Sequence, residues 1–305
     1  MIPLIIIAGP TASGKTALSV EIAKAVGGEI LSADSMQIYK YMDIGTAKPT
    51  LAERQGVPHH LMDMVHPTED FSLADYCCIA HKTIADIYNR GKFPIMVGGT
   101  GLYIDTVEDN IILSQSQGDE ELRKSLELFA KEKGNKALHQ MLKPIDRESY
   151  EKLHENDVKR IIRAIEVYKT TGQTISFHNK KSRNGEKLYK SVRLMFDYDR
   201  EVLYERINKR VDIMLKEGLE QEVRNLLDMG ITRDNTAMQA IGYKEMAEYI
   251  VGDITLDEAV EKIKMESRRY AKRQISWFKR KEYNLLSPCE NAVEKALEII
   301  KKDTL

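Results

Sequence analysis

The stretch GPTASGKT, residues 9–16, follows an apolar run at residues 4–8 and precedes a segment of helical character at residues 17–26. It matches G-x-x-x-x-G-K-[ST], the pattern of a phosphate-binding loop between a strand and a helix. Gly9 and Gly14 allow the tight turn that brings backbone N–H groups toward anionic oxygens. The amino end of the following helix adds positive potential. The stretch therefore predicts an α/β fold with a phosphate or diphosphate site.

The residues predicted to bind the phosphates are Gly9, Pro10, Thr11, Ala12, Ser13, Gly14, Lys15 and Thr16. Lys15 brings a mobile charge to the terminal phosphate, and the Thr16 hydroxyl suits Mg²⁺. The loop alone leaves nucleotide hydrolysis, phosphoryl transfer and capture of a diphosphate open. No Walker-B-type strand is evident, which argues against a motor or switch ATPase and leaves kinases and other ATP-binding or diphosphate-binding enzymes.

Other strands alternate with helices along the chain. Apolar runs at residues 29–32 and 93–97 are typical of buried strands, and helical periodicity covers residues 72–88. This alternation predicts a parallel sheet with its ligands at the carboxyl ends of the strands. Asp34 and Thr100 each lie just beyond one of these strands. We therefore expect both residues beside the phosphate loop.

The character of the sequence changes in the middle of the chain. Residues 113–186 are polar and look helical, and strand-like alternation returns at residues 189–198. We interpret this as a parallel α/β core, residues 1–112 and 187–305, interrupted by a helical insertion domain at residues 113–186.

Composition limits the class of protein. The chain has 305 residues, 42% of them hydrophobic, and a net charge of −1. That length allows a large buried core. Its three cysteines offer no disulfide framework and no C-x-x-C, which predicts a reducing, cytoplasmic compartment. No apolar run has the length of a membrane span, so we expect no membrane partner.

The segment from Asp34 to Gln37 has two interpretations. An Asp followed three residues later by a Gln is typical of a capping box at a helix start. Alternatively, the Asp34 carboxylate acts as a general base or as a Mg²⁺ ligand.

Two basic stretches are also ambiguous. Residues 268–281, RRYAKRQISWFKRK, contain seven basic residues, no acidic residue and three interleaved aromatic residues. Residues 154–166 predict a helix start followed by a basic stripe. Each stretch is consistent with a solvated helix face. In residues 268–281, the mixed basic and aromatic side chains equally suit phosphate contacts and base stacking on RNA.

Taken together and in order, seven motifs closely resemble the tRNA dimethylallyltransferase (tRNA isopentenyltransferase) family over nearly the whole chain. They are GPTASGKT at 9–16, SADSMQIY at 32–39, DIGTAKP at 43–49, VGGTGLY at 97–103, HENDVKRIIRAIE at 154–166, QAIGYKE at 239–245 and RRYAKRQISWFKR at 268–280. Seven motifs in one order are far more specific than any one of them.

The resemblance implies a P-loop, nucleotide-kinase-like core and transfer of a dimethylallyl group from dimethylallyl diphosphate to N6 of the adenine 3′ to the tRNA anticodon. Residues 9–16 would then hold the donor diphosphate, with Thr16 toward a Mg²⁺ cofactor and Lys15 on the leaving group, and Asp34 would accept the N6 proton. The sequence ends soon after the basic stretch, without the zinc-finger extension of eukaryotic relatives, so the resemblance implies a bacterial-type enzyme.

The implied partner is the anticodon stem-loop of a tRNA, bound by a monomer. The residues that match the family's tRNA-contacting positions, or lie in its basic stretch, are Asp34, Ser35, Met36, Gln37, Thr100, Arg123, Lys159, Arg160, Ile161, Ile162, Arg163, Arg269 and Arg273. Adenylate isopentenyltransferases and nucleotide kinases share this core, and a nucleic-acid-binding module without catalysis is a third class. The helical insertion and the basic stretch favour tRNA as the acceptor.

Overall fold

The computed structural model describes residues 1–111, 118–182 and 186–304. The chain divides into two compact units. The larger unit comprises Met1–Glu108 and Lys187–Leu305, and the smaller unit comprises Asp109–Glu186. The first boundary of the predicted insertion domain, between residues 112 and 113, lies outside the described residues.

The larger unit contains a single parallel sheet with the strand order β3-β2-β4-β1-β5-β6. Its strands are β1 (Ile2–Ala8), β2 (Gly28–Ser32), β3 (His59–His60), β4 (Phe93–Gly98), β5 (Tyr189–Phe196) and β6 (Asn284–Leu286). The central strand β1 reads as a continuous apolar run because both of its faces are covered, and Leu4 to Ala8 are all buried. The predicted α/β class with a parallel sheet is confirmed.

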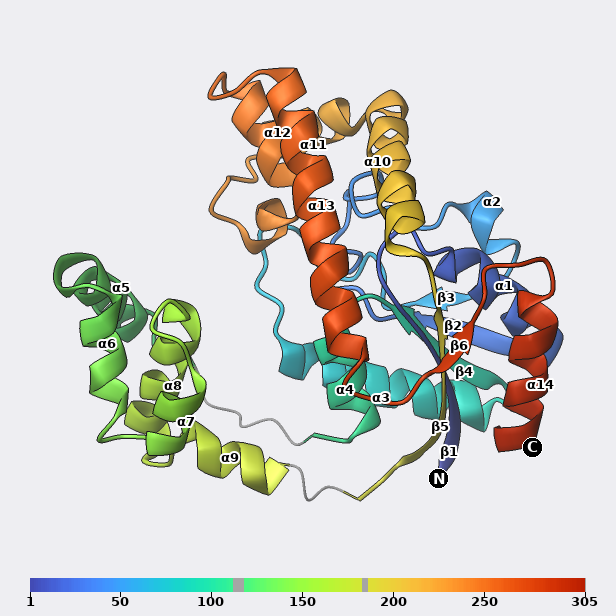
Figure 1. Cartoon of the computed structure of the whole chain (residues 1–305), viewed down its shortest axis with the longest axis horizontal. Helices are drawn as coiled ribbons and strands as arrows, with labels where there is room; N and C mark the ends of the chain where they lie inside the picture. Colours follow the sequence, from blue (N-terminus) through green and yellow to red (C-terminus); the bar gives the residue numbers. More distant parts are fainter. Residues whose placement is uncertain (112–117, 183–185, 305) are drawn as a thin grey trace. The chain divides into compact units, whose positions relative to one another are not determined.

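Helices cover both faces of this sheet (Figure 1). The helices and the 3-10 helix of the larger unit are α1 (Lys15–Val26), α2 (Leu51–Arg54), α3 (Leu73–Asn89), α4 (Gly101–Glu108), α10 (Arg200–Glu217), α11 (Leu219–Asp228), η1 (Thr236–Gln239), α12 (Tyr243–Ile250), α13 (Leu256–Phe278) and α14 (Ala292–Thr304). Helices α1 and α14 pack on one face, and α3 and α4 pack on the other. The doubly wound arrangement leaves the carboxyl edge of the strands open for a site.

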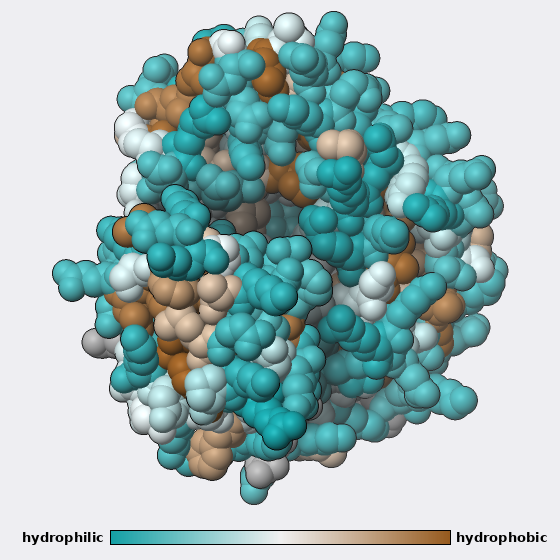
Figure 2. Space-filling view, turned by 60° about the vertical axis from the view of Figure 1, so that its left-hand side comes forward, coloured by the Kyte–Doolittle hydropathy of each residue, from teal (hydrophilic) through white to brown (hydrophobic). Residues whose placement is uncertain are grey.

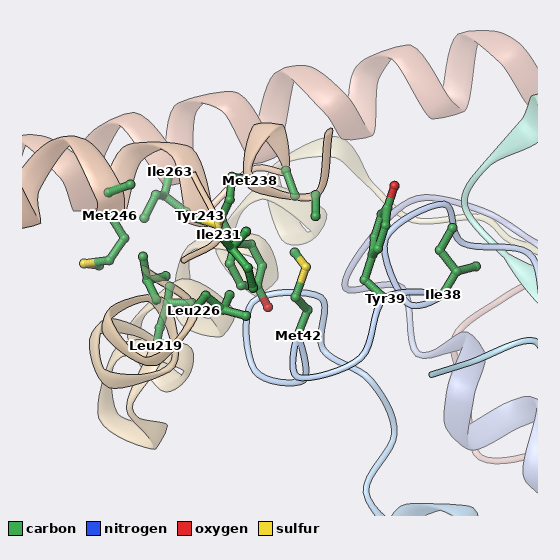
Figure 3. Packing of buried hydrophobic residues seen from close by; sticks show 14 of the residues in the cluster. Ile38, Tyr39, Met42, Leu219, Leu226, Ile231, Met238, Tyr243, Met246 and Ile263 are labelled. Carbon is green, nitrogen blue, oxygen red and sulfur yellow. The ribbon is translucent and has the colours of Figure 1, made fainter. Parts of the chain in front are cut away.

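A second core joins helices α10 to α13 to the segment that follows β2. Ile38, Tyr39 and Met42 of that segment are buried with side chains of all four helices. In Figure 3 the Tyr243 ring lies among the apolar side chains of this cluster, with its hydroxyl directed toward the loop that carries Met42. Helices α10 to α13 therefore hold in place the segment that follows β2, which lies next to the carboxyl edge of the sheet.

In its described residues, the smaller unit contains helices joined by loops and no strand. It consists of α5 (Glu120–Lys133), α6 (Asn135–Leu142), α7 (Arg147–Lys152), α8 (Val158–Thr171) and α9 (Ile175–Ser182). Leu126, Leu138, Leu142 and Ile165 form part of its own apolar core. The helical character predicted for the insertion is confirmed.

The surface is largely hydrophilic on the face shown in Figure 2, where hydrophobic side chains gather only in small groups. Within residues 1–111, 118–182 and 186–304, no helix is both long enough and apolar enough to cross a lipid bilayer.

Candidate active site

Three loops meet at the carboxyl edge of the sheet. They follow β1, β2 and β4, which are neighbours in the sheet. The N–H of Thr100 donates to the carbonyl of Ala33 at 3.1 Å, and the N–H of Ser35 donates to Oγ1 of Thr100 at 3.1 Å. The expected proximity of the loops that carry Asp34 and Thr100 is therefore confirmed.

The phosphate loop is already folded as a cradle. Gly9 and Gly14 have φ angles of 142° and 85°, in the region that favours glycine. The hydroxyl of Ser13 and the ammonium of Lys15 donate to the Pro10 carbonyl at 2.8 and 2.6 Å. Because the N-cap of α1, Gly14, has no side-chain cap, the N–H groups of the first turn are available to an anion.

A first cavity of about 80 Å³ opens beside this loop. Thr11, Lys15, Thr16 and Arg210 line one part of it. Burial, and then the charge of Arg210, lower the pKa of Lys15 to about 7, although Asp34 acts in the opposite direction. Two cations that face the same small space favour an anionic ligand. The apolar lining residues of the cavity include Ile30, Ala47, Pro49, Met62 and Val97.

Asp34 lies between this cavity and a second one. Its Oδ1 accepts the N–H of Met36 at 2.9 Å, and residues 35–38 form turns. The interpretation of residues 34–37 as a helix-capping box is therefore wrong, because no helix begins there. The carboxylate closes a local turn instead and lines both cavities.

The second cavity is larger, about 290 Å³, and more apolar. Its apolar wall contains Met36, Ile207, Val211, Met214, Ile241 and Ile263, and its polar lining includes Ser35, Gln239, Ser267, Tyr270 and Arg273. Thr11, Asp34, Thr46 and Arg210 line both cavities. A space suited to an anion and a larger, more apolar space therefore meet at a single carboxylate.

Gln37 lines the first cavity, whereas the two residues before it, Ser35 and Met36, line the second. Its Nε2 donates to the carbonyls of residues 46 and 47 at 3.2 and 3.3 Å, and its Oε1 accepts the Ser32 hydroxyl at 2.9 Å. Its side chain therefore fastens the loop that contains Thr46, and its contact with an acceptor base stays a prediction.

Gln274 is a site residue that the sequence did not reveal, although it lies inside the basic stretch. Its buried side chain accepts the N–H of Thr11 at 3.0 Å and donates to the Gly99 carbonyl at 2.9 Å. A Cβ atom on Gly99 would lie 2.1 Å from Nε2 of Gln274, so a larger residue at position 99 would displace the Gln274 amide. Arg206 of α10 likewise donates to the Ala12 carbonyl at 2.8 Å.

Helix α13 has two different faces in the basic stretch. Ala271, Gln274 and Phe278 are buried, and Nε1 of Trp277 donates to Asp105 at 2.8 Å. The exposed side chains are Arg269, Lys272, Arg273, Ser276, Lys279 and Arg280. The buried face thus holds the site together, and the exposed basic face stays open to both sequence interpretations.

Two arginines of the smaller unit bind one buried carboxylate. Glu166 binds Arg123 at 2.7 Å and Arg163 at 2.6 Å, and both guanidinium groups are partly exposed. Lys159 and Arg160 are exposed.

Two residues of the predicted tRNA-contacting segment at 159–163 have buried side chains that RNA could not reach. Ile161 and Ile162 are buried in the core of the smaller unit. Their side chains pack against other helices because they fall on the apolar face of α8. Contacts from this segment therefore depend on its basic side chains alone.

A divalent ion fits the donors of the first cavity. No group of three or more His, Cys, Asp or Glu side chains suited to a metal occurs among residues 1–111, 118–182 and 186–304. The Thr16 hydroxyl and the Asp34 carboxylate supply oxygen atoms in the first cavity. Mg²⁺ commonly takes one or two such protein ligands and completes its shell with phosphate oxygens and water.

This fold and site define a P-loop protein in which a space suited to an anion and a larger, more apolar cavity share one carboxylate. The family model described as IPP transferase matches residues 37–281, and that described as isopentenyl transferase matches residues 2–66. The chain belongs to the IPP transferase family.

Curated relatives agree with this assignment. The chain is 52% identical to a tRNA dimethylallyltransferase of Thermoanaerobacter sp. (strain X514) over 282 residues, which cover 91% of this chain and 89% of the relative. It is 53% identical to a tRNA dimethylallyltransferase of Acetivibrio thermocellus over 277 residues, with coverages of 91% and 88%.

Solved structures agree as well. A tRNA isopentenylpyrophosphate transferase of Bacillus halodurans superposes with a TM-score of 0.73 at 44% identity, covering 99% of this chain and 95% of that one. A eukaryotic dimethylallyltransferase described as acting on tRNA gives a TM-score of 0.81 at 29% identity, covering 100% of this chain and 77% of that one.

Proposed function

We propose that this enzyme transfers the dimethylallyl group of dimethylallyl diphosphate to N6 of the adenine 3′ to the anticodon of tRNA and releases diphosphate. The observation that carries this proposal is the junction of two unlike cavities at Asp34. Family membership supports the reaction class, because the compared relatives are named tRNA dimethylallyltransferases.

On the donor side, the phosphate loop, Lys15 and Arg210 bind the diphosphate. As the allylic C–O bond breaks, its electron pair leaves with the diphosphate, and these groups neutralise the charge that develops there. Bound Mg²⁺, held by Thr16 and diphosphate oxygens, would add Lewis-acid stabilisation of the leaving group. No phosphoryl group moves in this reaction.

On the acceptor side, the adenine ring occupies the second cavity with its amino group toward Asp34. The adenine amine is a weak nucleophile because its lone pair is delocalised into the ring. The new C–N bond forms between N6 and the allylic carbon, and the Asp34 carboxylate takes the proton that N6 loses. The Met36 side chain, on the cavity wall, packs against the base.

Basic side chains on each unit bind the RNA backbone. The larger unit offers Arg269 and Arg273 on α13, and the smaller unit offers Arg123 and Arg163 around Glu166. A base in an anticodon loop can leave its stack at lower cost than a base in a duplex, so it can enter the acceptor cavity. The monomeric state and the role of Thr100 in tRNA contact stay predictions.

Acceptor choice tests this proposal. We expect Mg²⁺-dependent prenyl transfer to tRNA and much weaker transfer to free AMP or ATP. We also expect no phosphorylation of nucleosides or nucleotides from ATP. Mass spectrometry of each acceptor after incubation distinguishes the outcomes. Preferred transfer to a free adenine nucleotide would identify an adenylate isopentenyltransferase, and kinase turnover comparable to prenyl transfer would contradict the proposal.

A further inference from the structure

The loop at residues 43–47 contributes to both cavities. Gly45 and Thr46 line the second cavity, and Thr46 and Ala47 line the first. This loop belongs to the motif DIGTAKP, and the donor and acceptor roles proposed above use neither this motif nor QAIGYKE at residues 239–245. What holds the loop in place therefore decides the shape of the junction at which the chemistry takes place.

A single carboxylate holds the loop. Oε2 of Glu222, on α11, accepts the N–H groups of Asp43 and Ile44 at 2.9 and 2.8 Å, and Oε1 accepts the N–H of Gly45 at 3.1 Å. Three consecutive backbone N–H groups that converge on one anion form the kind of concave site that binds phosphates in other proteins. Here the anion comes from the chain itself, about 180 residues away.

Tyr243 completes this arrangement. Its hydroxyl donates to Oε1 of Glu222 at 2.6 Å, and its ring is fully buried. The ring lies so close to Gly45 that a Cβ atom there would be 2.4 Å from it. Burial and the neighbouring Glu222 charge raise the pKa of Tyr243 well above its usual range, so the hydroxyl remains a donor. The Glu222 carboxylate therefore has four donors, and the loop cannot shift without losing them.

The effect of these contacts reaches the catalytic residues through Gln37. The carbonyls of Thr46 and Ala47 accept the Gln37 amide, whose oxygen accepts the Ser32 hydroxyl. Ser32 ends β2, two residues before Asp34. Hydrogen bonds at both ends of the loop, joined by its backbone, thus connect Glu222 to the strand end that carries the proposed base.

We propose that Glu222 and Tyr243 are positioning residues that fix the loop at residues 43–47 as the wall between the donor and acceptor cavities. Neither is among the described residues that line the two cavities, so each acts through the loop. This inference rests on the proposed function for its kinetic consequence. Its structural consequence, a loop held by Glu222, is independent of the reaction.

The variants Glu222→Gln and Tyr243→Phe test the proposal. Gln keeps the size of Glu but loses the charge and turns an amide donor toward N–H groups. We expect kcat/KM for tRNA to fall by roughly 10- to 100-fold, because hydrogen bonds to a charged group are stronger than neutral ones. The affinity for dimethylallyl diphosphate should fall less than kcat/KM for tRNA, because Lys15 and the phosphate loop lie outside the clamped loop, although Thr46 and Ala47 line the donor cavity. Tyr243→Phe removes one donor and should have a smaller effect in the same direction.

Two variants serve as matched controls. Glu220→Gln makes the same change two positions away on α11, where the side chain pairs with Arg224 on the surface. Tyr249→Phe makes the same change on α12, at a partly buried tyrosine packed against the same core. Both controls should retain wild-type kinetics and thermal stability.

Hydrogen exchange measured by mass spectrometry gives a second readout. In Glu222→Gln, the amides of residues 43–45 should exchange faster than in the wild type, while those of the phosphate loop should not. Wild-type exchange at residues 43–45, or a folded Glu222→Gln variant with wild-type kcat and KM for tRNA, would overturn the proposal. So would an activity loss that only matches the loss of folded protein. A wild-type enzyme without prenyl transfer would instead overturn the proposed function, and hydrogen exchange would still decide the role of Glu222.

Discussion

The phosphate loop at residues 9–16 and the loop at residues 43–47 line the same junction but are held in different ways. The phosphate loop has internal bonds, from Ser13 and Lys15 to Pro10, in addition to its bonds with Gln274 and Arg206. The second loop depends on Glu222 and Tyr243, which come from helices far along the chain. A loop of the first kind carries a recognisable sequence pattern, whereas a loop of the second kind shows its function only after folding.

The largest expected effect comes from breaking the donor side. Lys15→Ala should abolish prenyl transfer and weaken donor binding, because the ammonium is the mobile charge of the cradle. Binding of tRNA should remain, since the proposed RNA contacts lie elsewhere. Steady-state transfer and tRNA binding by fluorescence anisotropy check both expectations. The control is Lys24→Ala, an exposed lysine on the same helix. Unchanged donor affinity and turnover in Lys15→Ala would show that the loop has another role.

The second largest effect is expected at Asp34, where the two cavities meet. Asp34→Asn keeps the Oδ1 that closes the turn with Met36 but cannot accept a proton. The chemical step should slow by roughly 10²–10⁴, the usual range for loss of a general base, while both substrates still bind. Single-turnover kinetics with saturating substrates measure this step directly. A normal chemical step combined with lower stability would mean that Asp34 has only a structural role.

Sequence patterns predicted the site as far as neighbouring residues determine it. The phosphate loop, the parallel sheet and the placement of Asp34 and Thr100 at strand ends all follow from motifs and periodicity. The capping-box interpretation of residues 34–37 was wrong because the Asp34 carboxylate closes a turn instead of beginning a helix.

Residues that act across the fold were not predictable in this way. Glu222, Gln274 and Arg210 gain their roles from contacts or shared cavities that join positions far apart in the chain. Nothing in the local sequence distinguishes these residues from ordinary helix-surface residues. Ile161 and Ile162 show the opposite case, in which residues inside a matching motif serve the core.

A smaller effect concerns the exposed face of α13. Replacing Arg269 and Arg273 together by Ala should weaken tRNA binding and flatten the slope of log affinity against log salt by up to about 1–2 units, because each phosphate contact releases counterions. Donor affinity and thermal stability should change little. The double variant Arg224→Ala, Arg233→Ala removes two charges elsewhere on the larger unit and should leave the slope unchanged. An unaltered slope in the α13 variant would identify this face as solvated surface.

The smallest effect on transfer is expected at the amino end of β2, away from both loops. The hydrogen bonds from Arg90, opposed by burial and assisted by His60, lower the pKa of Glu29 to about 2. Because its folded-state pKa is depressed, the stability that Glu29 contributes is present above its ordinary pKa and is lost as the pH falls through about 2.

The variant Glu29→Gln tests this region. It should unfold at a lower temperature than the wild type near neutral pH, and the difference should shrink as the pH falls from its ordinary pKa of 4.5 toward 2. Thermal unfolding across this pH range measures the difference. Transfer by the folded variant at neutral pH should equal that of the wild type. A stability difference that grows on acidification would contradict the assigned contacts.

The most direct test of the account is the position at which the prenyl group arrives. An anticodon stem-loop with adenine 3′ to the anticodon is incubated with enzyme, dimethylallyl diphosphate and Mg²⁺, beside an otherwise identical RNA with guanine at that position. Fragment mass spectrometry then locates any added group. The account predicts the mass of one dimethylallyl group on that adenine and none on the guanine RNA. Equal modification of both RNAs, or modification of neither, would contradict it.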